Sequence, residues 1–136
     1  MDIFSLLEQQ NIFLTPAQKQ AVTAEQEAVL LLAVPGAGKT TTLAARVAWL
    51  MAEGRCSADQ MLNLTFNREA AADMQRRFAQ LFGGVWPAAQ HPKFSTIHSF
   101  CYRLLGEYAA DRGTQVPQLL AEGQQRRLVM DIWREK

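Results

Sequence analysis

The sequence has little of what marks secreted, metal-binding or membrane proteins. Only two cysteines occur in its 136 residues, Cys56 and Cys101, and they lie far apart without metal-ligand spacing. The opening segment M-D-I-F-S-L-L-E-Q-Q has too short an apolar run for a secretory signal, and no later run is long enough to span a membrane. We therefore expect a cytoplasmic protein with reduced thiols that does not associate with membranes.

A strong excess of charge is also absent. Fourteen basic residues against thirteen acidic ones give a formal net charge of +1, so any nucleic-acid binding must be local. The adjacent arginine pairs Arg76–Arg77 and Arg126–Arg127 are interpreted as solvated helix faces and not as DNA tracks. An apolar fraction of 49%, without repeats or low-complexity runs, indicates one packed domain or part of one.

The most informative segment is residues 28–42, A-V-L-L-L-A-V-P-G-A-G-K-T-T-T. The unbroken apolar run at 28–34 predicts a strand that is covered on both faces in a parallel sheet. Gly36 and Gly38 then permit a tight loop with inward-pointing amides, and Lys39 begins a helix whose dipole favours negative charge at its amino end. The segment predicts a phosphate cradle for a nucleoside triphosphate. The alternative is an ordinary glycine turn with a solvated lysine.

This segment departs from the strict G-x-x-x-x-G-K-[ST] pattern at Ala33, which stands where the first glycine is expected and keeps its small volume. In this interpretation Lys39 reaches the β and γ phosphates of ATP, and the hydroxyl of Thr40 holds Mg²⁺. These two residues are the expected catalytic groups. The loop residues expected to contact the nucleotide are Ala33, Pro35, Gly36, Ala37, Gly38, Lys39, Thr40 and Thr41.

A second signal, T-P-A-Q-K-Q-A-V, precedes the cradle. Thr15 can cap a helix whose first residue is Pro16, which places Gln18 on the first turn. A glutamine amide carries a donor and an acceptor side by side, and these can pair with the N6 and N7 edge of adenine. The alternative for Gln18 is an ordinary surface residue.

Helical and strand patterns alternate along the rest of the chain. Helices are predicted over residues 2–10, 16 onward, 39–53, 57–60, 68 onward, 96–110 and 122 onward, and further short strands over residues 61–66 and 93–95. His91 lies in a loop flanked by prolines and is expected at the surface. Strand, helix and strand in succession indicate a parallel crossover and the α/β fold class.

Four segments, taken in order, resemble the opening motifs of superfamily 1 helicases of the UvrD/Rep type. They read L-T-P-A-Q-K-Q-A-V, A-V-P-G-A-G-K-T-T, L-T-F-N-R-E-A-A-A-D-M and F-S-T-I-H-S-F-C-Y-R-L-L. The resemblance implies a RecA-like P-loop NTPase fold, with an incomplete parallel sheet flanked by helices and the start of a helical insertion at the carboxyl end. It implies the ATP-binding domain 1A over residues 1–115 and a truncated start of subdomain 1B over residues 116–136.

The resemblance also implies residue roles, beginning with Gln18 as the group that reads adenine. The residues implied to contact single-stranded DNA are Thr65, Phe66, Asn67, Arg68, Thr96, His98 and Ser99. An aromatic ring such as Phe66 can stack on any base, although its position alone favours a buried residue that ends a strand. His98 alone is typical of a structural histidine. Glu69 replaces the customary lysine, so a phosphate contact there is in doubt, and Arg68 can substitute.

Hydrolysis also needs carboxylates for Mg²⁺ and for the attacking water, and usually an arginine. In the resembled family these groups lie on a D-E-x-x strand and beyond it, and the sequence has neither. We therefore expect the amino-terminal part of an ATP-dependent 3′ to 5′ DNA helicase, acting with its remaining domains on single-stranded or partly duplex DNA. This part alone is expected to bind triphosphate weakly with negligible turnover. The alternatives are a non-enzymatic DNA- or protein-binding module of helicase-like fold and another P-loop NTPase, such as a kinase.

Overall fold

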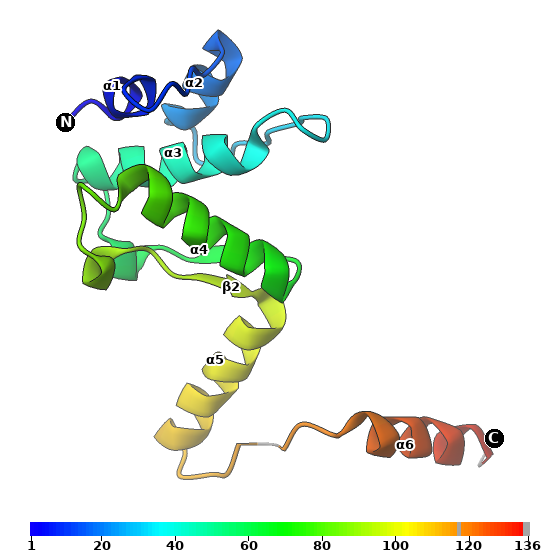
Figure 1. Cartoon of the computed structure of the whole chain (residues 1–136). Coiled ribbons are helices and arrows are strands. Elements are labelled where there is room, and N and C mark those ends of the chain that lie inside the picture. Colours follow the sequence, from blue (N-terminus) through cyan, green and yellow to red (C-terminus); the bar gives the residue numbers. More distant parts are fainter. Residues whose placement is uncertain (117, 135–136) are drawn as a thin grey trace. The chain divides into compact units, whose positions relative to one another are not determined.

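The computed structural model describes residues 1–116 and 118–134 (Figure 1). The chain divides into two compact units, Met1–Ile97 and His98–Lys136. The helices are α1 (Ile3–Glu8), α2 (Pro16–Val22), α3 (Lys39–Ala52), α4 (Arg68–Phe82), α5 (Ile97–Asp111) and α6 (Glu122–Arg134), with short 3-10 turns η1 (Ala58–Gln60) and η2 (Ala88–Gln90). The predicted helices are confirmed to within a few residues at their ends.

Side-chain caps determine where several helices begin. Asp2 caps α1 by accepting hydrogen bonds from the Phe4 amide and the Ser5 hydroxyl. These bonds, the one from the Ser5 hydroxyl first, stabilise the ionised form and lower the pKa of Asp2. Thr15 caps α2 in a reciprocal box with Gln18, and Pro16 is its first residue, as predicted. Each cap satisfies amides that the first turn of a helix leaves without an intrahelical partner.

The sheet consists of two short parallel strands, β1 (Asn63–Thr65) and β2 (Phe94–Thr96). Their register pairs Asn63 with Phe94 and Thr65 with Thr96. The connection between them contains α4, which packs against both strands. Both strands were expected at these positions, and the α/β class is confirmed.

The prediction of a strand over residues 28–34 is wrong. The structure shows this run as irregular backbone between α2 and α3 (Figure 1). Leu30 and Leu32 are 82% and 83% exposed, while Val29 and Leu31 are only about half as exposed, at 44% and 41%. This alternation is that of extended backbone, but a strand requires a hydrogen-bonded neighbour, and within the described residues β1 and β2 pair only with each other.

One hydrophobic core holds α1 to α4 together. Its buried members are Ile3, Leu7, Leu14, Val22, Ala44, Ala45, Val47, Ala48, Met74, Phe78, Leu81 and Phe82. Phe78 is fully buried, and its ring lies 5.3 Å from that of Phe82 and 5.4 Å from that of His91. The surface prediction for His91 is wrong, because its ring is half-buried edge-on against Phe78 and its Nε2 lies 2.9 Å from the Trp86 carbonyl.

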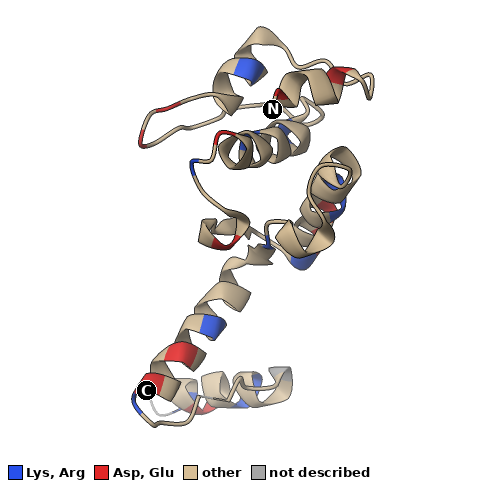
Figure 2. Cartoon of the chain, turned by 90° about the vertical axis from the view of Figure 1, so that its left-hand side faces the viewer, with Lys and Arg blue, Asp and Glu red and all other residues tan. Residues whose placement is uncertain are grey.

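The second unit contains most of α5 and all of α6, and little of it is buried. The large apolar side chains that it exposes are Tyr102, Leu104, Leu105, Tyr108, Leu119, Leu120, Leu128, Val129, Met130, Ile132 and Trp133. In both units basic and acidic residues are interspersed along the elements (Figure 2). Across residues 1–116 and 118–134, every helix falls short of the length and apolarity needed to cross a membrane.

Phe78→Ala is expected to lower the free energy of unfolding by about 3–5 kcal/mol, because it empties the centre of the core. Urea denaturation followed by circular dichroism measures this change. Phe66→Ala is the matched control: Phe66 is 91% exposed, and its loss should change stability by no more than about 0.5 kcal/mol. Equal effects of the two substitutions would show that Phe78 is not central to the core.

Candidate functional site

The loop that leads into α3, where the sequence predicts the cradle, contains two glycines in the left-handed region. Gly36 and Gly38 have φ values of 80° and 72°, in the left-handed region that favours glycine. Gly38 is also the N-cap of α3, and a Cβ placed on it would lie 3.0 Å from Nε2 of Gln18. Gly36 is therefore favoured by its backbone conformation alone. Gly38 is favoured by its conformation and also because a side chain there would crowd Gln18.

Lys39 folds back over this loop. Its Nζ donates hydrogen bonds to the carbonyls of Ala33 and Val34 at 3.0 Å and 2.9 Å. The side chain stays exposed at the first residue of α3, where the helix dipole and the free amides favour an anion. The ammonium group thus lies between the carbonyls of Ala33 and Val34, on a side chain that begins at the first residue of α3.

The three successive threonines of α3 have different environments. Thr42 is buried and donates to the Gly38 carbonyl at 3.0 Å, and the half-buried Thr41 accepts from Nη2 of Arg77 at 3.0 Å. Thr40 is exposed, and among the described residues its hydroxyl makes no hydrogen bond. Thr40 is therefore the threonine whose oxygen remains available for a cation or a phosphate.

Gln18 connects α2 to the cradle. Its Oε1 accepts from the Thr15 amide at 2.8 Å, and its Nε2 donates to the Ala37 carbonyl at 2.9 Å. A primary amide has two N–H donors and two acceptor lone pairs, so one donor and one acceptor remain. The side chain is fixed at both ends and still carries the pair of groups that the N6 and N7 edge of adenine requires.

Arg46 fixes the position of α2 against α3. From α3, its Nη1 donates to the carbonyls of Ala21, Val22 and Ala24 at 2.9 Å, 3.1 Å and 3.0 Å. The last carbonyls of a helix have no intrahelical donor and attract positive charge. This contact was not predicted, although an arginine inside the apolar stripe of α3 is a signal that could have indicated it.

Five of the residues expected to contact DNA lie at or just after the ends of β1 and β2: Thr65, Phe66, Asn67, Arg68 and Thr96. Thr65 and Thr96, which are 31 positions apart in the numbering, face each other in the strand register. Phe66 follows β1 and is 91% exposed, so the alternative of a buried strand-ending residue is wrong. Asn67 caps α4 through its side chain, which accepts from the Ala70 amide at 2.7 Å. Arg68 follows it as an exposed residue on the first turn of α4.

His98 and Ser99 lie on the first turn of α5, immediately after Thr96 in the chain. Both are exposed, and both belong to the second unit, His98–Lys136. The chain continues without a break from β2 into this helix, because α5 begins at Ile97. The expected DNA residues therefore divide between the end of the sheet and the start of α5.

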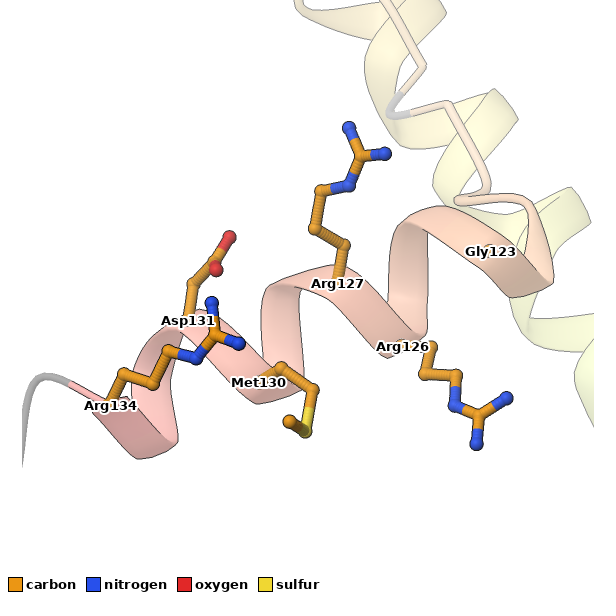
Figure 3. A pocket seen from close by; sticks show the side chains of 6 residues that line it. All are labelled: Gly123, Arg126, Arg127, Met130, Asp131 and Arg134. Carbon is orange, nitrogen blue, oxygen red and sulfur yellow. The ribbon is translucent and has the colours of Figure 1, made fainter.

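Other chemistry is sparse in the described residues. No cluster of three or more His, Cys, Asp or Glu side chains occurs within them. A shallow hollow on α6 is lined only by residues of that helix: Gly123, Arg126, Arg127, Met130, Asp131 and Arg134. Its arginines do not converge, since Arg126 and Arg127 extend to opposite sides of the helix (Figure 3).

The family follows from comparison with known proteins. Residues 14–136 match the family model described as the UvrD/REP helicase N-terminal domain. The chain belongs to this family. The UvrD/REP match covers the loop at 33–38, the α2 capping box and both strand ends, which are the parts of the structure that carry the candidate residues.

Several relatives are helicases by name. DNA helicase II of Escherichia coli is 36% identical over 115 residues, which cover 82% of this chain and 14% of the relative. ATP-dependent DNA helicase UvrD1 of Mycobacterium leprae is 40% identical over 102 residues, covering 71% and 12%. ATP-dependent DNA helicase PcrA of Bacillus subtilis is 39% identical over 92 residues, covering 68% and 12%. The chain therefore spans only 12–14% of the length of these relatives.

Arg46→Met is expected to lower the free energy of unfolding by about 2–4 kcal/mol, because three carbonyls at the end of α2 lose a charged donor. Thermal and urea melts measure the change. Arg76→Met is the matched control, since Arg76 is 69% exposed in its pair with Asp73 and such pairs contribute about 0–1 kcal/mol. A loss no larger than that of the control would contradict the role given to Arg46.

Proposed function

We propose that the chain is the amino-terminal part of the ATP-binding domain of a DNA helicase, a P-loop NTPase of RecA-like fold. In this proposal domain 1A covers residues 1–115, and residues 116–136 begin subdomain 1B. The full-length protein hydrolyses ATP to move along single-stranded or partly duplex DNA, in the 3′ to 5′ direction that the resemblance implies. The chain's membership of the UvrD/REP helicase family supports this proposal.

The observation that carries the proposal is the environment of Lys39 and Thr40. The Lys39 ammonium is 2.9–3.0 Å from the carbonyl oxygens of Ala33 and Val34, which precede the loop, and the neighbouring residue Thr40 is exposed. These groups fit a magnesium-bound triphosphate: Lys39 would hold the β and γ phosphate oxygens, Thr40 would hold Mg²⁺, and the amides of Gly36 to Thr40 would surround the phosphates. Bound Mg²⁺ would neutralise charge on the phosphates.

The exposed Phe66 supports the DNA part of the proposal. An aromatic ring that is 91% exposed at the end of a strand offers a flat apolar face to an unstacked base. Of its polar neighbours, Thr96 is buried, Thr65 donates to the Asn67 and Ser95 carbonyls and Asn67 caps α4, so the exposed Arg68 is the group best placed for a phosphate contact. His98 and Ser99 belong to the second unit, and their contact with DNA is proposed from the family resemblance alone.

Lys39→Ala in the full-length protein is expected to lower kcat/KM for ATP on the order of 100-fold or more, because the ammonium stabilises charge on the transferred phosphoryl group. ATPase rates with and without single-stranded DNA measure this loss. Lys93→Ala, an exposed lysine outside the cradle, should retain full ATP affinity. An ATPase indifferent to DNA would favour another P-loop NTPase, and unaltered turnover in Lys39→Ala would remove the basis of the proposal.

The same assay tests the isolated 136-residue chain. Among the described residues, no carboxylate forms an ion pair or hydrogen bond with Lys39 or Thr40, and hydrolysis needs such a group to position the attacking water. We expect weak triphosphate binding by calorimetry and no hydrolysis above that of its Lys39→Ala variant. DNA-stimulated hydrolysis by the 136-residue chain alone would contradict the expectation that it lacks part of the active site.

Gln18→Glu is expected to lower the preference for ATP over GTP about tenfold. The carboxylate keeps an oxygen for the Thr15 amide but loses the donor to adenine N7, and a bidentate base contact contributes about 1–3 kcal/mol. Affinities for ATP and GTP in the full-length protein measure the ratio. Gln20→Glu, an exposed residue on the same helix, is the control. A ratio that stays at its original value would assign Gln18 to the capping box alone.

A further inference from the structure

Two neighbouring arginines on α4 have different surroundings. Arg76 pairs with Asp73 on its own helix and is 69% exposed. Arg77 is half-buried, and its Nη2 donates to Oγ1 of Thr41 on α3 at 3.0 Å. The interpretation of this arginine pair as a solvated helix face therefore holds for Arg76 and is wrong for Arg77.

The packing of α4 keeps Arg77 in this position. Met74, Phe78 and Leu81 are buried on α4, and Arg77 lies three residues after Met74 and four before Leu81, on the edge of the same face. A rotation of α4 that brought Arg77 into water would also expose Met74, Phe78 and Leu81. The hydrogen bond from Arg77 to Thr41 also joins two different helices, α4 and α3, which pack against each other. It therefore restricts how these helices can move relative to each other.

The guanidinium of Arg77 has no carboxylate partner among the described residues, where the ion pairs are Lys19–Glu8, Arg55–Glu25 and Arg76–Asp73. Arginine is usually placed at a half-buried position when its planar, multi-donor group is used. Here the acceptor is a neutral hydroxyl one residue after Thr40. The charge thus lies beside the first turn of α3, which carries the candidate phosphate-binding groups.

The other end of α4 begins at the candidate DNA residues. Asn67 is its N-cap, and Thr65 and Phe66 precede it directly. The helix is 15 residues long, and a helix of that length with a buried face moves as one body. One rigid element therefore connects the end of the sheet with the turn that holds Lys39 and Thr40.

We propose that Arg77 is a positioning residue that joins α4 to the first turn of α3 through Thr41, so that DNA contact at the start of α4 changes the placement of Lys39 and Thr40. This inference rests on the proposed function. In this proposal Arg77 itself contacts neither the nucleotide nor the DNA. Its effect is on the coupling between the two ligands, which is a free energy shared by both sites.

The test is the DNA stimulation of ATP hydrolysis in the full-length protein, taken as the ratio of kcat with saturating single-stranded DNA to kcat without it. Arg77→Gln is expected to lower this ratio about tenfold, as the loss of a hydrogen bond to a charged donor allows. Arg77→Lys keeps a charged donor and should restore part of the ratio. Arg76→Gln, the neighbouring control, should leave the ratio as it is.

Thr41→Val removes the acceptor and serves as the second variant if Arg77→Gln folds poorly, which thermal melts reveal. Each single change should lower the ratio to a similar extent, and the double variant should be no worse than Arg77→Gln alone. Additive losses of the ratio, or equal losses of the stimulated and unstimulated rates in Arg77→Gln, would overturn the inference. The unstimulated rate of Thr41→Val is not a criterion, because Thr41 is itself an expected nucleotide contact. If the unmodified protein shows no stimulation by DNA, the proposed function fails instead, and this outcome is distinguishable from the others.

Discussion

The candidate nucleotide site depends on the hydrogen bonds from Arg46 to the end of α2. At seven residues, α2 is too short to be stable by itself. The guanidinium satisfies three carbonyls at the helix terminus that would otherwise lack donors, and its charge complements the dipole there. Because Arg46 belongs to α3, the same contact sets the distance between Gln18 and the loop at residues 33–38. The bond from Gln18 to Ala37 then completes the connection at the other end of α2.

The α4 helix joins the remaining parts of the first unit. Its aromatic residues Phe78 and Phe82 fill the core, its Asn67 cap follows the end of β1, and its Arg77 reaches α3. A helix in such a position cannot shift at one end without changing its contacts at the other, since packed interiors are dense and resist compression. The core thus does more than stabilise the fold, because it fixes the geometry between two groups of candidate residues.

Local sequence rules predicted what local interactions decide. Thr15, Pro16 and Gln18 specify the start of α2 through bonds within four residues. Strands were predicted over residues 61–66 and 93–95, and the structure has them at Asn63–Thr65 and Phe94–Thr96. The strand over residues 28–34 failed because pairing requires a distant neighbour that periodicity cannot supply. Burial of His91 and Arg77 was missed for the same reason, since each depends on α4 meeting another element.

The geometry of Lys39 bears on how strongly the cradle can favour a triphosphate. Its ammonium already donates to two neutral carbonyls, of Ala33 and Val34, so binding of a triphosphate would replace these hydrogen bonds and would not add new ones. The gain lies in replacing neutral acceptors by charged phosphate oxygens, whose hydrogen bonds are roughly twice as strong. It is largest for an acceptor with the most charge near Nζ, which favours a triphosphate over a diphosphate. Gly36 and Gly38 adopt the left-handed conformation without the strain that other residues would have there, and a loop that already has its bound conformation loses little of that gain on ordering.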